Sequence, residues 1–356
     1  MHTEDILDRP VVAVVILSWN GKSFLEQYLP SVMQLRYQPL DIYVADNAST
    51  DDTIPFLQQQ YPSIHIIRIP KNEGFAKGYN IALKSVVADY FFLLNQDVEV
   101  TPDCIQHLVD VMQADDAIAA CQPKILATWN RTQFEHAGAA GGFMDAFGYT
   151  FCRGRLFNQE EQDTGQYDTS CEIFWASGAA MLVRADLFKR FKGFDPDYFA
   201  HMEEIDLCWR WKRAGYSIQY QPAATVYHVG GGSLPKENPY KIYLNFRNNL
   251  FMLFKNYESY ELIWRFPLRI LLDNVAFVHA LLKGRWKEAG AIFRADWHFV
   301  ISFPLQLKKR YDNWKLYNRN RVASSRVKKG GYYPKSIVWQ FFVKGRKVFS
   351  DLPAID

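Results

Sequence analysis

The sequence of 356 residues has no uninterrupted apolar run of the kind that crosses a membrane. A spanning helix needs about 20 mostly apolar residues in a row, so we expect none. The apolar stretch Val11–Leu17 is also too short for the core of a signal peptide. The five cysteines lie far apart and never in CxxC spacing. This spacing argues against a disulfide framework and a zinc site and favours a reducing compartment. We therefore expect a cytoplasmic protein.

Two nucleotide-binding fingerprints are missing as well. Gly21-Lys22-Ser23 has the ending of a phosphate-loop motif, but the first glycine of that motif would fall at Ile16. No GxGxxG motif follows the apolar stretch Val11–Leu17 either. The composition, with 49% apolar and 22% charged residues, excludes disordered and low-complexity classes. The sequence thus predicts a globular protein that is neither a P-loop protein nor a dinucleotide-binding one.

What the sequence does have is an uneven distribution of charge. The net charge is only +3, but residues 1–235 carry 18 Lys and Arg against 29 Asp and Glu. Residues 236–356 carry 23 basic against 9 acidic residues. Basic segments attract anionic partners such as membrane surfaces, nucleic acids or phosphates. The second part of the chain is therefore expected to meet such a partner.

The first hundred residues alternate short apolar runs with stretches of helical periodicity. The runs expected to be strands are Val11–Leu17, Asp41–Ala45, His65–Ile69 and Tyr90–Leu94. This order predicts an α/β fold with a Rossmann-like, mostly parallel sheet and helices on both faces. The glycine-rich section from about residue 120 to 200 predicts long surface loops over a site.

Polar side chains follow each of these strands, at the edge where parallel sheets bind ligands. A carboxylate at Asp46 can accept a hydrogen bond from a base or a ribose hydroxyl. After the fourth strand, Asn95, Asp97 and Glu99 would face the same way on an extended backbone. Oxygen ligands grouped in this way suit a hard divalent cation. The candidates from the strand ends are Ser18, Trp19, Asn20, Asp46, Asn47, Lys71, Asn72, Asn95 and Asp97.

An acidic cluster opens a helix that is expected to run from about Glu203 to Ala214. It contains Glu203, Glu204 and Asp206. The helix dipole stabilises carboxylates at this end, which is a sufficient structural reason for them. Aromatic neighbours can instead raise a carboxylate pKa toward the working range of a general base. Both interpretations stay open from the residues alone.

His228 follows a late strand and precedes three glycines, residues 230–232. A lone histidine is more often structural than a ligand. Consecutive glycines let the backbone approach a ligand closely and offer amide groups to phosphate oxygens. His228 is therefore a candidate site residue.

Taken in order, these segments resemble family 2 glycosyltransferases of the GT-A fold, and above all the rhamnosyltransferase-like branch of bacterial polysaccharide assembly. The resemblance covers roughly residues 10–235. The strings that carry it, besides the His228 segment, are Val15-Ile16-Leu17-Ser18-Trp19-Asn20, Val44-Ala45-Asp46-Asn47-Ala48-Ser49-Thr50-Asp51, Asn72-Glu73-Gly74-Phe75-Ala76-Lys77-Gly78-Tyr79-Asn80, Leu93-Leu94-Asn95-Gln96-Asp97, Ala176-Ser177-Gly178-Ala179-Ala180, Gly193-Phe194-Asp195 and Glu203-Glu204-Ile205-Asp206-Leu207-Cys208.

The resemblance implies how a nucleotide-sugar donor is bound. Asp46 is expected to bind the nucleotide base, with Ser18 and Asn20 in the same pocket. Asp97 is expected to hold a divalent metal, Mg²⁺ or Mn²⁺, on the donor diphosphate, and His228 to be a further metal or diphosphate ligand. Asn95 stands where the wider family has the first Asp of a DxD motif, and Glu99 would compensate for it. The other residues expected at the donor are Asn72, Gly74, Asn80 and Asn95.

The resemblance also implies the chemistry. Glu204 aligns with the Asp of the family's ED motif, the expected general base; Glu203 remains the alternative, and Asp206 belongs to the same cluster. The expected activity is an inverting, metal-dependent transfer of one sugar, such as rhamnose, from a nucleotide diphosphate to a lipid-linked glycan or polysaccharide. The alternative is a non-catalytic nucleotide-sugar-binding or scaffold protein that retains the fold.

The expected division of the chain is a GT-A domain at residues 1–235 and a helical, basic and aromatic region at residues 236–356. Leu262–Leu282 and Ala291–Leu307 are strongly apolar. Such helices can lie in the interface of an anionic membrane, with Trp and Arg side chains at headgroup level. Arg265, Arg269 and Asp273 are expected on one face of the first helix. They can otherwise pack as core or form a dimer interface. No nucleic-acid-binding motif accompanies the charge, so we expect no nucleic-acid partner. A peripheral protein on the inner face of the cell membrane is thus predicted.

Overall fold

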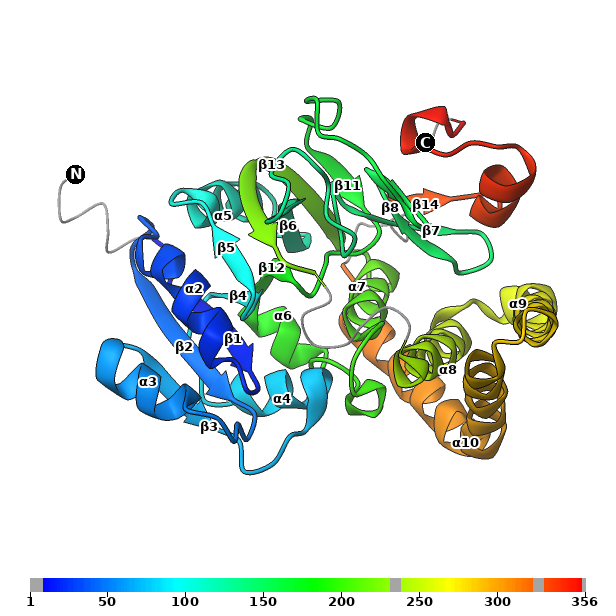
Figure 1. The fold of residues 1–356 in the computed structure, drawn as a ribbon, viewed down its shortest axis with the longest axis horizontal. Coiled ribbons are helices and arrows are strands. Elements are labelled where there is room, and N and C mark those ends of the chain that lie inside the picture. The colour runs from blue at the N-terminus through cyan, green and yellow to red at the C-terminus, as the bar shows by residue number, and fades with distance from the viewer. Residues whose placement is uncertain (1–8, 231–237, 323–329, 354–356) are drawn as a thin grey trace.

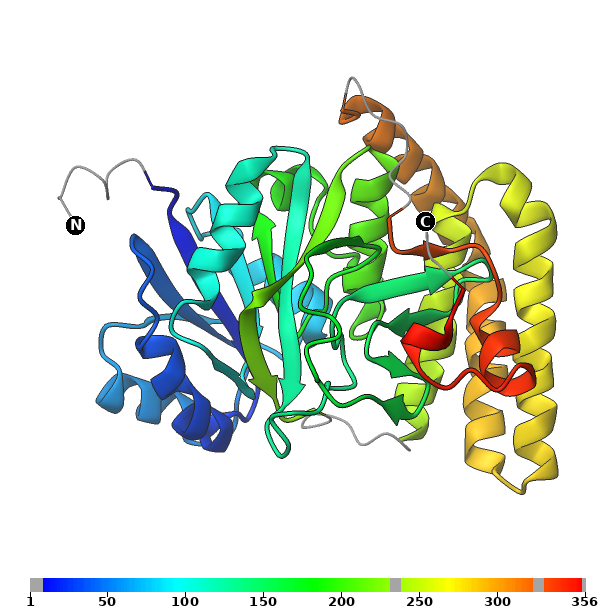
Figure 2. The same cartoon turned by 90° about the horizontal axis from the view of Figure 1, so that it is seen from above.

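The computed structural model describes residues 9–230, 238–322 and 330–353. Its centre is a nine-stranded mixed sheet in the order β11-β13-β6-β12-β4-β1-β2-β3, with β5 paired to β13 (Figure 1). A smaller sheet and a group of long helices lie beside it (Figure 2). The α/β class expected from the sequence is confirmed.

The first half of the central sheet is parallel. It contains β1 (Val12–Ser18), β2 (Leu40–Asp46), β3 (His65–Arg68) and β4 (Tyr90–Asn95). Helices α2 (Lys22–Met33), α3 (Thr53–Gln60) and α4 (Gly74–Ala82) connect these strands. Residues 12–16 of β1 are at most 1% exposed, because β1 lies between two neighbouring strands and two layers of helices.

Alternate side chains of β1 enter two different cores, as strand geometry requires. Val12 and Val14 pack in the core that includes α2, α3 and α5 (Cys104–Ala114). Ala13 and Val15 belong to the core that includes α4, α6 (Ala185–Arg190) and α7 (Glu203–Arg213). The predicted covering of both faces by helices is confirmed.

The second half of the sheet is mixed. Strand β12 (Ala180–Arg184) runs antiparallel between β4 and β6 (Ile118–Ala127). Beyond β6 lies the long β13 (Ser217–His228), which pairs with it in parallel. The short strands β5 (Val98–Val100) and β11 (Cys171–Ile173) pair with β13. The last residue of β13, His228, pairs in register with Val98, so the end of β13 lies beside the turn that follows β4.

The glycine-rich middle section is not the set of surface loops that we expected. Residues 142–160 of this section form four strands of a five-stranded sheet in the order β10-β9-β8-β7-β14, and β14 comes from the C-terminal part. The prediction was wrong because strands of two to four residues between glycines are too short to show a period in the sequence. The strands are β7 (Gly142–Asp145), β8 (Thr150–Cys152), β9 (Arg155–Leu156), β10 (Gln159–Glu160) and β14 (Tyr332–Tyr333).

The C-terminal part is mainly helical, with α8 (Pro239–Asn256), α9 (Ser259–Leu282) and α10 (Trp286–Arg319). The short helices η2 (Trp339–Val343) and η3 (Phe349–Asp351) follow, and η1 (Pro196–Tyr198) precedes α7. Helices α9 and α10 form a long hairpin at the end of the molecule opposite β3 and α3 (Figures 1 and 2). Residues of α8, α9 and α10 share the buried core of α4, α6 and α7. None of the described helices is long and apolar enough to cross a bilayer.

Candidate functional site

The carboxyl ends of β1, β2 and β4 meet at one edge of the sheet. Ser18 is in register with Asp46, and Leu17 is in register with Asn95. The Ser18 hydroxyl donates to Oε1 of Gln96 at 2.8 Å, which ties the end of β1 to the turn after β4. The parallel order predicted from the sequence is therefore what brings these polar residues together.

A cavity of about 450 Å³ opens at this edge. One wall comes from the ends of β1 and β4, and the other from the start of α7 and of α8. Of the residues predicted at the site, it is lined by Ser18, Asn72, Gly74, Asn95, Asp97, Glu203, Glu204 and His228. Gly74 has a φ of +73°, and a Cβ there would lie 2.5 Å from the Phe199 ring, so glycine is required.

Asp97 and His228 form one side of the cavity. The Nε2 atom of His228 lies 3.3 Å from Oδ1 of Asp97. Its Nδ1 atom lies 3.2 Å from Oε2 of Glu135. Although burial lowers the pKa of His228, the Glu135 and Asp97 carboxylates raise it to about 10. His228 therefore lies at the cavity between the Asp97 and Glu135 carboxylates.

Glu135 is a site residue that the sequence analysis missed. It lies before the small sheet, accepts a hydrogen bond from Ala137 N at 2.6 Å and is 5% exposed. Gly230 has a φ of +72°, and a Cβ there would lie 2.5 Å from Oε1 of Glu135. This close approach, together with the positive φ, explains why residue 230 is a glycine. The other two glycines after His228 lie outside the described residues.

The two glutamates at the start of α7 form the other side of the cavity. Glu203 is 4% exposed. Among the described residues, neither Oε2 of Glu203 nor Oε2 of Glu204 has a hydrogen-bond partner. Burial raises the pKa of Glu204 to about 7, and burial with the adjacent Glu204 raises the pKa of Glu203 well above its usual range. Such a pKa is what a general base near neutral pH requires.

The cavity residues that the sequence analysis did not single out include His201, Tyr240 and Lys241. His201 lines the cavity beside the glutamates, and its Nε2 atom has no hydrogen-bond partner among the described residues. Burial lowers the pKa of His201 to about 4, so its imidazole is neutral at pH 7. Tyr240 and Lys241, in the first turn of α8, line the same end. They come from the part of the chain where the sequence resemblance has ended.

Asp206 does not line the cavity. It lies one turn further along α7, is fully buried and faces away into a network of ion pairs. Its carboxylate contacts Arg210 at 2.8 Å and Lys255 at 3.2 Å. It also accepts hydrogen bonds from Tyr198 and Asn256 at 3.1 and 2.8 Å. Burial opposes ionisation, but Lys255 and Arg210 hold the pKa of Asp206 below its usual range. The contacts of the Asp206 carboxylate therefore indicate a structural role.

Three predicted donor-binding residues also lie outside the cavity lining. The Asn20 side chain accepts a hydrogen bond from Thr50 N at 2.7 Å. Asp46 is 5% exposed, and both carboxylate oxygens lie 3.3 Å from Ser49 N. Asn80 bonds the backbone of Phe194 in both directions, at 2.7 and 2.9 Å. Each of the three holds a turn at the edge of the site.

Glu99 is not a partner of Asp97, contrary to our expectation. The extended backbone that we assumed ends at Asn95, and a turn at Gln96 and Asp97 separates β4 from β5. Glu99 therefore points elsewhere and pairs with Arg131 at 2.7 Å. Among the described residues no group of three or more His, Cys, Asp and Glu side chains is arranged to hold a metal ion.

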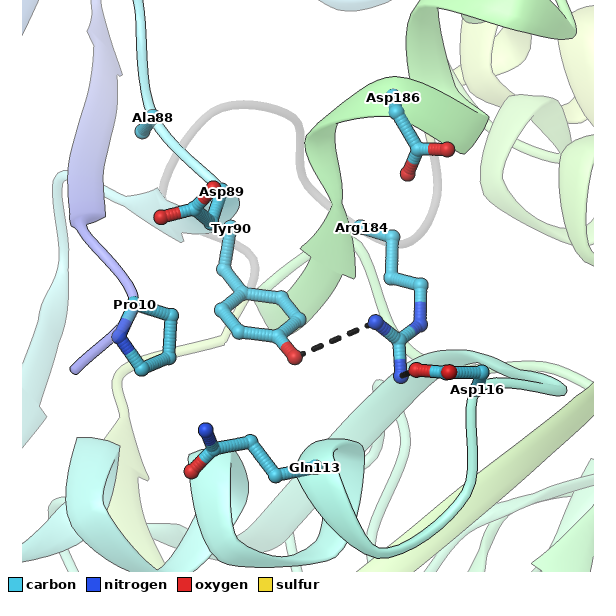
Figure 3. A pocket seen from close by; sticks show the side chains of 8 residues that line it. All are labelled: Pro10, Ala88, Asp89, Tyr90, Gln113, Asp116, Arg184 and Asp186. Carbon is cyan, nitrogen blue, oxygen red and sulfur yellow. Dashed lines mark hydrogen bonds and ion pairs between the residues drawn. The ribbon is translucent and has the colours of Figure 1, made fainter. Parts of the chain in front are cut away.

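A second cavity, of about 380 Å³, lies at the opposite edge of the sheet, where β1 and β4 begin (Figure 3). Arg184 reaches across it to the Tyr90 hydroxyl at 3.3 Å and to Asp116 at 3.3 Å. Arg184 also donates to the backbone of Ile118 at 2.8 Å, which anchors β6. These contacts give this cavity a structural role.

The comparisons with known proteins agree with this geometry. The model of glycosyl transferase family 2 matches residues 13–190, which is half of the chain. An N-acetylglucosaminyl-diphospho-decaprenol L-rhamnosyltransferase of Mycobacterium tuberculosis is 25% identical over 277 residues, which cover 73% of this chain and 88% of the relative.

Two solved structures share the fold at low sequence identity. Staphylococcus aureus TarS 1–349 in complex with UDP-GlcNAc superposes with a TM-score of 0.54 at 13% identity, covering 88% of this chain and 93% of that one. The mannosyltransferase PcManGT of Pyrobaculum calidifontis, in complex with GDP-Man and Mn²⁺, has a TM-score of 0.51 at 13% identity and covers 88% and 87%. The chain therefore belongs to glycosyl transferase family 2 and is a glycosyltransferase with the GT-A fold.

Proposed function

We propose that the protein transfers one sugar, with inversion, from a nucleotide-diphosphate donor to a hydroxyl of a lipid-linked glycan or polysaccharide. The observation that carries this proposal is the cavity itself. It places Asp97 and His228 on one side and two glutamates on the other, each with one carboxylate oxygen that has no hydrogen-bond partner among the described residues. A direct sugar transfer needs the charge of the leaving diphosphate to be neutralised and a proton to be removed from the acceptor. The side with Asp97 and His228 suits the first task, and the side with the two glutamates suits the second.

The donor diphosphate is proposed to bind beside Asp97 and His228. A carboxylate oxygen of Asp97 suits Mg²⁺ or Mn²⁺, as does an imidazole nitrogen of His228 once metal binding has displaced its proton. Two protein ligands leave positions for phosphate oxygens and water. A bound divalent cation would supply positive charge for the leaving diphosphate. Glu135 would hold the other nitrogen of His228, as carboxylates do behind metal-binding histidines. The Mn²⁺ in the related mannosyltransferase structure supports this assignment.

Glu204 is proposed as the general base, since it matches the catalytic position of the family motif. Its carboxylate removes the proton of the acceptor hydroxyl, and the hydroxyl oxygen forms the new bond to the anomeric carbon. The bond from that carbon to the phosphate oxygen breaks, and the nucleoside diphosphate leaves with the electron pair. One displacement from the opposite face inverts the anomeric carbon. Glu203, next to it, is proposed to stay protonated.

The acceptor is proposed to be linked to a lipid at the cytoplasmic face of the membrane, and rhamnose is the proposed sugar. The name of the mycobacterial relative specifies both an L-rhamnosyl group and a diphospho-decaprenol acceptor. All five cysteines are unpaired, which suits a reducing compartment. Residues 1–235 would carry out the reaction, and residues 236–356 would hold the acceptor side.

A panel of nucleotide-diphosphate sugars that includes an activated rhamnose tests the proposal. We expect one donor to be hydrolysed slowly with Mn²⁺, to be transferred quickly when a lipid-linked acceptor is added, and to be left intact with a chelator. Binding of nucleoside diphosphates without hydrolysis or transfer of any donor would favour the scaffold alternative and overturn the proposal.

A further inference from the structure

The outward face of α9 carries an apolar stripe along its whole length, with the exposed Asn274 and His279 beside it. Exposed apolar residues recur every three or four positions, which is the spacing of a single helix face. Leu271 and Val275 in the middle are each 58% exposed. The stripe consists of Tyr260, Trp264, Pro267, Leu271, Val275, Val278 and Leu282.

The inward face of the same helix carries its charged residues. Arg269 and Asp273 are 5% and 1% exposed and pair at 2.9 Å, and Arg269 also donates to the Asn249 side chain of α8 at 2.6 Å. Arg269 therefore does not reach the outer surface. This differs from our expectation that the Arg side chains of this helix lie at the headgroup level of a membrane. A surface helix in water has the reverse arrangement, with apolar residues inward and charged residues outward.

Helix α10 has a similar exposed stripe. Its spacing is again three or four residues, with Gly290 as a small member between the first two aromatic residues. Trp and Tyr are frequent in it, and these side chains favour the boundary between water and lipid. The stripe consists of Trp286, Gly290, Phe293, Trp297, Val300, Pro304, Leu307, Tyr311 and Trp314.

The tip of the α9–α10 hairpin combines apolar and basic residues. Leu282 and Trp286 are 82% and 70% exposed, and Gly284 makes the turn between the helices with a φ of +70°. From the tip to the end of α10, the one exposed acidic residue is Asp312. The exposed basic residues over the same range are Lys283, Arg285, Lys287, Arg294, Lys308, Lys315 and Arg319.

We propose that this hairpin docks the protein on an anionic lipid bilayer, with the Leu282–Lys287 tip and the apolar stripes in the headgroup layer. Only one part of this proposal rests on the proposed function, namely that docking brings the protein to a lipid-linked acceptor. Continuous apolar stripes of this length mark a contact surface. Their basic border matches an anionic surface. A second copy of the chain would bring the same positive border against itself.

The hairpin is also coupled to the active cavity. Helix α8 begins at the cavity, where Tyr240 and Lys241 line it, and its side chains pack on α10 through the Phe254 and Phe299 rings, 5.5 Å apart. Figure 2 shows the turn between α9 and α10 at the same end of the molecule as the start of α8. A bilayer at this turn would thus carry the acceptor near the residues of α8 that line the cavity.

The test is co-sedimentation of the full-length protein with vesicles of equal parts phosphatidylglycerol and phosphatidylcholine, without donor or acceptor. One variant combines Lys283→Ser, Arg285→Ser and Lys287→Ser, and a second combines Leu282→Ser and Trp286→Ser. The matched control is Val87→Ser, since Val87 follows α4 and is 83% exposed. Donor hydrolysis in solution checks that each variant is folded, because the tip lies outside the cavity lining.

We expect the wild type and Val87→Ser to bind these vesicles, and to bind pure phosphatidylcholine more weakly. The triple basic variant should bind about 100-fold more weakly, from about 1 kcal/mol for each basic residue. The double apolar variant should also lose binding, with donor hydrolysis unchanged in both. Absence of vesicle binding by the wild type at low salt would overturn the proposal. So would tip variants that keep vesicle binding but lose a dimer in sedimentation velocity, since a second copy would then cover the hairpin.

Discussion

Helix α7 separates two regions that both hold buried carboxylates. At the cavity, one oxygen of Glu203 and one of Glu204 have no hydrogen-bond partner among the described residues. Behind the helix, Asp206 has four partners within 3.2 Å. A buried charge without partners costs stability, and one with partners does not stay free for chemistry. The difference teaches that the number of partners, rather than burial, distinguishes a reactive carboxylate from a structural one.

The largest expected effect is the loss of transfer rate when the proposed base, Glu204, is replaced. Glu204→Gln should lower the transfer rate by about 10²–10⁴-fold, because the amide cannot accept the proton of the acceptor hydroxyl. Transfer to a saturating acceptor is the measurement, with circular dichroism to confirm the fold. Glu203→Gln is the matched control and should keep most of the activity. If the two variants exchanged these effects, Glu203 would be the base.

The next largest effect is expected in the ion network. Asp206→Asn leaves Arg210 buried without its carboxylate and leaves Lys255 with Asp195 alone, so it should destabilise the protein by about 3–5 kcal/mol. Urea unfolding followed by tryptophan fluorescence measures this change. Transfer by the fraction that remains folded should be near normal. A variant of wild-type stability that has lost transfer would instead place Asp206 in the chemistry.

A smaller change in stability is expected for Glu203→Gln, and it should stabilise the protein, whereas Asp206→Asn destabilises it. The pKa of this carboxyl is raised by burial and by Glu204, so it keeps its proton in the folded state at a pH where it is ionised in the unfolded state. The native state then binds more protons, and stability falls as the pH rises above the unfolded pKa of about 4.3. Glu203→Gln removes this loss and should stabilise the protein by about 1–3 kcal/mol at pH 8. A fall in stability would show that the carboxylate has a partner.

The contrast between the two regions depends on residues that lie far apart in the sequence. The order of strands and helices up to residue 100, and the polar residues after the strands, were predictable because each strand carries its own apolar pattern. The pairing of Asp206 was not, since Lys255 and Asn256 follow it by about 50 residues in the other part of the chain. The role of Glu135 was not predictable either, because no local pattern connects it to His228.

The uneven charge now has two explanations. Part of the basic excess neutralises the acidic part from within: Lys255 pairs with Asp195 at 2.6 Å, and Lys309 pairs with Asp195 and Asp197. Burial opposes ionisation of Asp195, but these lysines hold its pKa well below the usual range. The basic residues at the hairpin tip are exposed, and although Arg285 pairs with Glu288 at 2.9 Å, Lys283 and Lys287 point their charge toward an external surface. Charge totals from sequence cannot separate these two groups.

The most direct test of the role of α7 is the pH dependence of kcat/KM for the acceptor at saturating donor and metal. Because burial raises the pKa of Glu204 to about 7, the base is protonated below that pH. The rate should then fall about tenfold per pH unit. The same acid limb should appear in Glu203→Gln, and the residual rate of Glu204→Gln should be flat over this range. An unchanged acid limb in Glu204→Gln would contradict the assignment of Glu204 as the base.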